Sequence, residues 1–207
     1  MSGRGSSRGA AAVEFMLAAV LLLAPLAVAS FELLQLAISR QLLQAALADG
    51  VRAAATAHGD LDLLRRVVAR GLLPLHGAPR ETTTRPELAT AYLRSLAEVQ
   101  RPDLTQLAVR SPSRADFRRE GLALGDDRRI PNDGTASVGA NTLDVHVVYC
   151  RALVIPASDL LFRAVFAALP TGPAARCLQQ GRMPIAAGAS TVMQSDASAR
   201  ALGLLGP

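Results

Sequence analysis

The chain has 207 residues, half of them hydrophobic, and its formal net charge of +5 at pH 7 comes from 22 basic residues that are all arginine. The arginines are scattered and aromatic residues make up only 3% of the chain. A basic surface without stacking side chains lacks the usual features of a nucleic-acid binder. We therefore expect no nucleic-acid partner.

The N-terminal region predicts a transmembrane helix. From Ala10 to Phe31 the chain is mostly apolar, and Glu14 is its only charged residue. At about 1.5 Å per residue this stretch covers roughly 33 Å as a helix, which matches a bilayer core of about 30 Å. Arg4 and Arg8 precede it without an intervening acid. We expect a cytoplasmic N-terminus and export of the remaining residues.

A cleavable signal peptide is an alternative interpretation. The small residues Ala27-Val28-Ala29, preceded by Pro25, resemble a signal-peptidase site. Cleavage after Ala29 would release a secreted soluble binding protein. Against this, strong helix formers continue past residue 29, where an unrelated mature sequence should begin. A third alternative is an uncleaved bitopic membrane protein of unrelated role.

The helix is expected to continue to residue 57, with Pro25 introducing a kink. Polar residues recur beyond the apolar span at helical spacing, and we expect them to face solvent while the opposite side packs against the domain. The first polar set is Glu32, Gln35 and Ser39, and the second is Asp49, Arg52 and Thr56.

Residues 58–207 are expected to form one exported α+β domain, with about three antiparallel strands covered by helices. We expect helices over 60–70, 84–100, 158–169 and 174–180, and strands over 104–110, 143–150 and 185–194, the last two paired. The helix over 84–100 should bury its apolar side chains, which are Leu88, Tyr92, Leu96 and Val99. Residues 111–142 read as a flexible loop with a turn at 132–134, and residues 195–207 as a loose tail.

The two cysteines, Cys150 and Cys177, both lie in the exported part. An even count in an oxidising compartment favours one disulfide, although two buried free thiols are the alternative. The disulfide would close a loop of about 27 residues and contribute roughly 3 kcal/mol.

Catalytic and metal-binding patterns are not found in the sequence. His58, His76 and His146 are widely separated, with His146 on the polar face of a strand, and Asp126-Asp127 next to two arginines reads as a solvated charge cluster. No nucleophile elbow, glycine-rich phosphate loop or zinc spacing occurs. We expect no enzymatic activity, cofactor or metal.

The stretch from Gly9 to Ala55 resembles the N-terminus of TadE-like proteins, pseudopilins of the tight-adherence (Flp-type) branch of type IV pili. The resemblance rests on an ordered set: small residues after a glycine, then Val-Glu-Phe, an apolar span, and a later helix containing Asp-Gly-Val-Arg-Ala-Ala-Ala. It covers about a quarter of the chain. It implies a minor pseudopilin of the bacterial inner membrane with a periplasmic domain.

The resemblance also implies the site residues and partners. A prepilin peptidase would cut the 1–9 leader after Gly9, making Ala10 the first mature residue and Glu14 the fifth. Glu14, Phe15 and Pro25 would then pack against other pilin-like subunits and the inner-membrane pilus assembly platform. Glu14 would pair with the terminal ammonium of a neighbour. The alternative is that its carboxylate simply reaches the nearby lipid headgroups.

Overall fold

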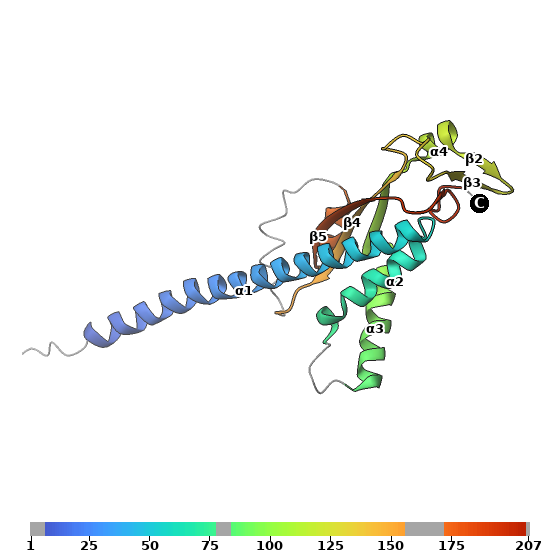
Figure 1. The fold of residues 1–207 in the computed structure, drawn as a ribbon. Helices are drawn as coiled ribbons and strands as arrows, with labels where there is room; N and C mark the ends of the chain where they lie inside the picture. Colours follow the sequence, from blue (N-terminus) through green and yellow to red (C-terminus); the bar gives the residue numbers. More distant parts are fainter. Residues whose placement is uncertain (1–6, 78–83, 156–171, 206–207) are drawn as a thin grey trace, which may run out of the picture.

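The computed structural model describes residues 7–77, 84–155 and 172–205. It is an α+β protein in which a long helix, α1, projects from a domain built of helices and two small antiparallel sheets of three strands each (Figure 1). This is the fold class expected from the sequence. The N-terminal end of α1 and the domain lie at opposite ends of the molecule.

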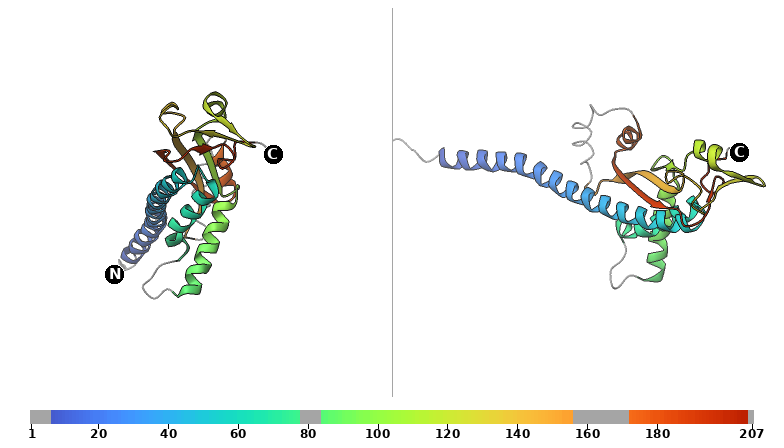
Figure 2. Two further views of the ribbon diagram at one scale, coloured as in Figure 1. Left: turned by 45° about the vertical axis from the view of Figure 1, so that its right-hand side comes forward. Right: turned by 45° about the horizontal axis from the view of Figure 1, so that its top comes forward.

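Helix α1 runs from Ser7 to Thr56 without interruption. It continues through Pro25, and Figure 2 shows a gradual change of direction along the helix instead of a sharp kink. The helix ends where the sequence predicts, because His58 and Gly59 both adopt positive φ angles, 58° and 83°. A helix of 50 residues is about 75 Å long, and only its second half contributes buried residues to the core of the domain.

The larger sheet has the order β1-β4-β5, with β1 over Thr105–Ser111, β4 over Thr142–Ala152 and β5 over Arg182–Val192. Both pairings are antiparallel, and the central residue Val147 lies opposite Leu107 on one side and Ala187 on the other. The three expected strands and the expected pairing of the last two are confirmed. Alternate residues of β4 are buried, as its period-two pattern predicts.

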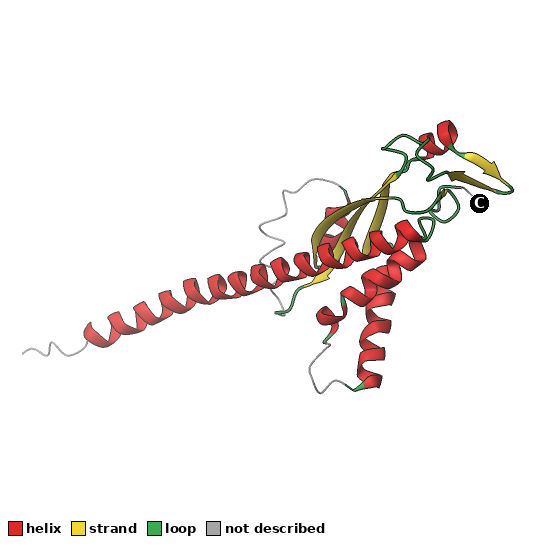
Figure 3. Ribbon diagram, viewed as in Figure 1, coloured by secondary structure: helices red, strands yellow, loops and turns green. Residues whose placement is uncertain are grey.

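The main core lies between this sheet and the second half of α1 (Figure 3). Buried apolar residues of α1 face those of β4, β5 and α2, an amphipathic helix over Leu61–Gly71 that begins at its capping residue Asp60. The largest fully buried side chains of this core include Leu43, Leu47, Val51, Leu64, Leu143, Val145 and Tyr149. Half of α1 is therefore an integral part of the domain.

Helix α3, over Arg85–Gln100, starts at Thr84 with a reciprocal capping box to Glu87, as expected, and follows the short 3-10 helix η1 over Leu73–His76. Its predicted core face is partly wrong. Val99 is buried, and Tyr92 and Leu96 are partly buried and pack against the core, as expected. Leu88, however, is 42% exposed, and the small residues Ala91 and Ser95 are buried. The small side chains let α3 approach α2 closely, and Ser95 Oγ donates to Ala69 O at 2.7 Å.

The prediction of a flexible loop over residues 111–142 is wrong. The segment contains α4 over Arg114–Glu120, β2 over Leu122–Leu124 and β3 over Asp127–Ile130. Strand β3 also pairs with β6, Ala197–Ser198, so residues 195–205 of the predicted loose tail are ordered too. These short elements are stabilised by burial of side chains from distant parts of the chain, namely Phe117, Ile130, Ala199 and Leu202.

Asp127 is the polar centre of this second sheet, so the interpretation of Asp126-Asp127 as a solvated cluster holds for Asp126 alone. Asp127 accepts hydrogen bonds from Ser198 Oγ at 2.7 Å and from the backbone N–H of Arg200 at 3.0 Å. Its side chain is only 12% exposed, against 87% for Asp126. Asp127 therefore fixes the C-terminal segment to β3.

Helix α6, over Pro173–Gln179, carries Cys177, and the predicted disulfide to Cys150 is present. Both cysteines are fully buried and form a small separate cluster with Leu104. The helix predicted over 158–169 lies outside the described residues.

Candidate functional site: the exposed part of α1 and its junction with the domain

The first half of α1 is exposed and apolar. From residue 12 onward α1 is long and apolar enough to cross a membrane, and none of its most apolar 18-residue window is buried in the described structure. Large side chains along it are between 61% and 76% exposed from Val13 to Leu26. Such a surface needs a bilayer or other apolar helices around it.

The predicted processing and packing residues all lie on this half of α1. Gly9 and Ala10 are in its first turn, and Glu14 follows one turn later. Glu14 and Phe15 are both exposed, with Phe15 at 76%, and Pro25 lies within the helix. The structure thus places Glu14, Phe15 and Pro25 on one continuous surface that is open to a partner.

At the junction with the domain, the predicted orientation of α1 is wrong. Glu32 and Ser39, assigned to a solvent face, are each only 1% exposed. Leu33, Leu34 and Ile38 are instead 55%, 58% and 42% exposed. The polar face of this stretch is therefore buried against the domain, and its apolar face is open. The second polar set, Asp49, Arg52 and Thr56, is exposed as expected.

Glu32 is buried because backbone donors bind it. Its two carboxylate oxygens accept hydrogen bonds from the N–H groups of Val154 at 3.2 Å and Ile155 at 2.5 Å, just after β4 ends. A buried carboxylate is tolerated where such donors replace its hydration. Glu32 directly follows the apolar span, so this contact attaches the domain to the helix at the end of that span.

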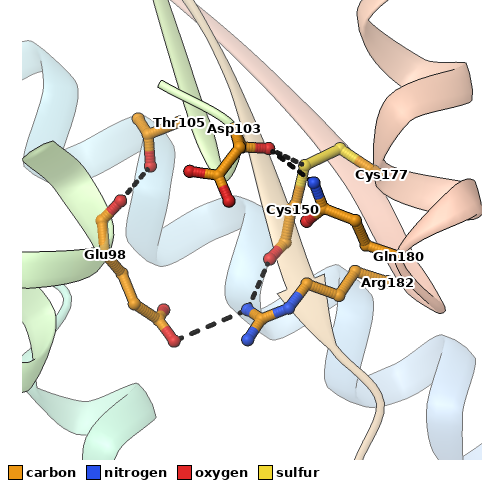
Figure 4. Close-up of a disulfide and its surroundings, with 7 residues drawn as sticks. All are labelled: Glu98, Asp103, Thr105, Cys150, Cys177, Gln180 and Arg182. Atoms are coloured by element: carbon orange, nitrogen blue, oxygen red, sulfur yellow. Dashed lines mark hydrogen bonds and ion pairs between the residues drawn. A yellow bond between two sulfur atoms is a disulfide. The ribbon is translucent and has the colours of Figure 1, made fainter. Parts of the chain in front are cut away.

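A second polar cluster centres on Glu98, near the disulfide (Figure 4). The Tyr149 hydroxyl donates to Glu98, Arg182 Nη1 lies 3.5 Å from Glu98 Oε1, and the same Nη1 donates to Cys150 O at 3.1 Å. The pKa of Tyr149 is raised, mainly by burial of its hydroxyl and to a smaller extent by the hydrogen bond to Glu98. The cluster joins α3 to β4 and β5, which is a structural role.

The histidines do not converge. His76 Nε2 is 3.7 Å from Glu98 Oε2, whereas His58 bonds Asp196 O and His146 lies on β4 between Ala108 and Gly188. Among the described residues, no group of three histidine, cysteine or acidic side chains is placed to hold a metal. Asp133 forms the predicted turn by accepting from the N–H of Thr135 at 2.9 Å.

The buried role of Glu32 could not be identified from sequence spacing, because its contacts come from residues more than 120 positions later. The buried acid beside exposed leucines is seen only in the folded structure, where the residues just after β4 bind Glu32. Comparison of the chain with protein-family models, with curated proteins and with solved structures gave no match.

Proposed function

We propose that the protein is a TadE-like minor pseudopilin: a single-span inner-membrane protein with a periplasmic domain that takes part, without catalysis, in assembling a Flp-type adhesion pilus. The observation that carries the proposal is the division of α1. One continuous helix supplies an exposed apolar half and a second half that forms the core of the domain.

This division supports assembly through helix packing. Lipid gives no hydrophobic drive between helices, so association depends on close contacts of small residues and on polar pairs. The exposed half of α1 offers both, with alanines at Ala12, Ala18 and Ala24 and the carboxylate of Glu14. Cleavage after Gly9 would create an ammonium on Ala10, and pairing between subunits would offset the cost of placing both charges in lipid.

The proposal is tested by the mature N-terminus, measured by mass spectrometry of the protein purified in parallel from the membrane fraction and from the soluble and secreted fractions. A chain that starts at Ala10 is expected. A start at Ser30 would identify the secreted binding protein instead, and a start at Met1 or Ser2 the uncleaved bitopic protein. Either result contradicts the proposal.

Two substitutions separate processing from assembly. Gly9→Leu should block cleavage by a prepilin peptidase, whereas Gly5→Leu, inside the leader, should not. Glu14→Ala should leave cleavage intact but reduce pilus number, and Glu14→Asp should restore part of it. Normal piliation with Glu14→Ala would refute the ion-pairing role and favour the headgroup interpretation.

A further inference from the structure

A groove between α2 and α3 combines an apolar floor with arginines. It has a volume of about 490 Å³. Its apolar residues include Leu73, Leu88 and Tyr92, and its basic residues are Arg66, Arg70 and Arg85. We call it the α2–α3 groove. Leu88 is 42% exposed there, although its position in α3 predicts a core residue. Tyrosine and arginine are enriched at interface hot spots, and Tyr92 and the arginines of the groove lie beside this exposed leucine.

The charge of the α2–α3 groove is of one sign. No acidic residue is among the described residues that line it. The nearby Asp60 lies 3.8 Å from Arg66, and this pair is largely exposed. Glu87 is turned to the start of α3, where its carboxylate accepts from the N–H of Thr84 at 2.9 Å. The groove therefore presents a positive rim to an incoming ligand.

The position of the groove argues against lipid headgroups as that ligand. The C-terminal end of α2 lies against α1 at Ala46, since a Cβ on Gly71 would meet Ala46 Cβ at 2.4 Å. Ala46 is 15 residues beyond Phe31, the end of the apolar span, which is about 22 Å along the helix. That is more than twice the Debye length of about 8 Å at physiological salt.

We infer that the α2–α3 groove binds an acidic amphipathic helix of a partner protein. Arg85, Leu88 and Tyr92 follow one another at helical spacings of three and four, so the groove extends over about two turns. A helix placed along it would bury leucines against Leu88 and Tyr92, and carboxylates on its flanks would meet the three arginines. The inference does not depend on the pilus proposal, because the groove lies wholly in the domain.

The test uses the full chain in detergent micelles and a synthetic 18-residue helix with leucines on one face and glutamates on the flanks. Binding is measured by fluorescence anisotropy. The acidic peptide should bind at least tenfold more tightly than the same peptide with lysines in place of the glutamates, and NaCl should weaken its binding. Leu88→Glu should weaken it at least tenfold, and Arg85→Gln severalfold.

Matched controls are available on the same helix. Leu93 is 63% exposed and Arg94 is exposed, and neither lines the groove. Leu93→Glu and Arg94→Gln should change the affinity less than twofold. Equal binding of both peptides, or equal effects of Leu88→Glu and Leu93→Glu, would overturn the inference. So would crosslinking of a benzophenone at position 88 to phosphatidylglycerol or to a second copy of the chain in nanodiscs.

Discussion

Substitution of Gly71 by alanine tests how closely α2 packs on α1. A Cβ at position 71 would lie 2.4 Å from Ala46 Cβ and 3.0 Å from Ala46 Cα. Carbon atoms in contact prefer about 3.5–4.0 Å, so α2 must shift by roughly 1 Å. Because the contact is far inside van der Waals distance, the overpacking cost falls in the upper part of the usual range, about 2–3 kcal/mol, whereas the gain in helix propensity is at most about 1 kcal/mol. We expect a net loss of about 1–2 kcal/mol, and a Tm lower by roughly 2–8 °C.

The assay is thermal unfolding of the full chain in detergent, followed by circular dichroism. Ala46→Gly removes the opposing methyl group, so the double variant should be more stable than the sum of the two single effects predicts, by about 1 kcal/mol. Gly139→Ala is the control, because a Cβ there meets nothing within 4 Å. A Gly71→Ala variant as stable as the parent, or additive effects in the double variant, would refute the close contact.

Three further predictions concern the polar and covalent links of the domain. Glu32→Ala should destabilise the protein by about 1–3 kcal/mol in urea unfolding because it removes the buried carboxylate that accepts from the N–H groups of Val154 and Ile155, while Glu32→Gln should cost less. Cys177→Ser should lower the free energy of unfolding by roughly 3 kcal/mol, because it opens the 27-residue loop that the disulfide closes. Reduction of the parent protein should lower it by the same amount, which is measured by urea unfolding with and without dithiothreitol. Burial lowers the pKa of His76 below its ordinary value of 6.5, so near this pH the unfolded chain binds a proton that the folded chain does not. The free energy of unfolding should therefore fall as the pH drops below about 6.5. His76→Gln should flatten this pH dependence, measured by urea unfolding at several pH values.

The large elements could be predicted from the sequence because each carries its own periodic signal. The 3.6-residue pattern of α2 and the alternation in β4 are local, and both elements occur within two residues of the predicted bounds. The disulfide was also predictable, because a chain with two cysteines allows a single intramolecular pairing. These features depend little on the rest of the chain.

The second sheet could not be predicted, because its strands have two to four residues and no usable periodicity. Its order depends on Asp127, whose carboxylate binds Ser198 and Arg200 from the C-terminal segment. An aspartate among arginines looks solvated in the sequence. Only the folded structure places the C-terminal segment beside Asp127, where Ser198 and Arg200 donate hydrogen bonds to its carboxylate.

The core face of α3 differs in part from the sequence prediction for a related reason. Apolar size selects Leu88 over the smaller residues Ala91 and Ser95. Where two helices approach closely, small residues fill the contact and large ones lie at its rim. The Gly71–Ala46 contact between α1 and α2 obeys the same rule. The mispredicted Leu88 is one of the residues that line the α2–α3 groove.

If the proposed function is correct, the two acids on the first part of α1 constrain how neighbouring subunits would pack. Glu32 lies 18 residues after Glu14, which is five helical turns and about 27 Å, so the two carboxylates share one side of the helix apart from the bend between them. The domain covers that side at Glu32, while Leu34 and Ile38 lie on the other side and are exposed. A subunit that neutralises Glu14 would therefore lie in the bilayer beneath its neighbour's domain, and a contact through Leu34 and Ile38 would use the opposite side. A helix with interaction surfaces on both sides can join two neighbours at once, which an assembly of more than two subunits requires.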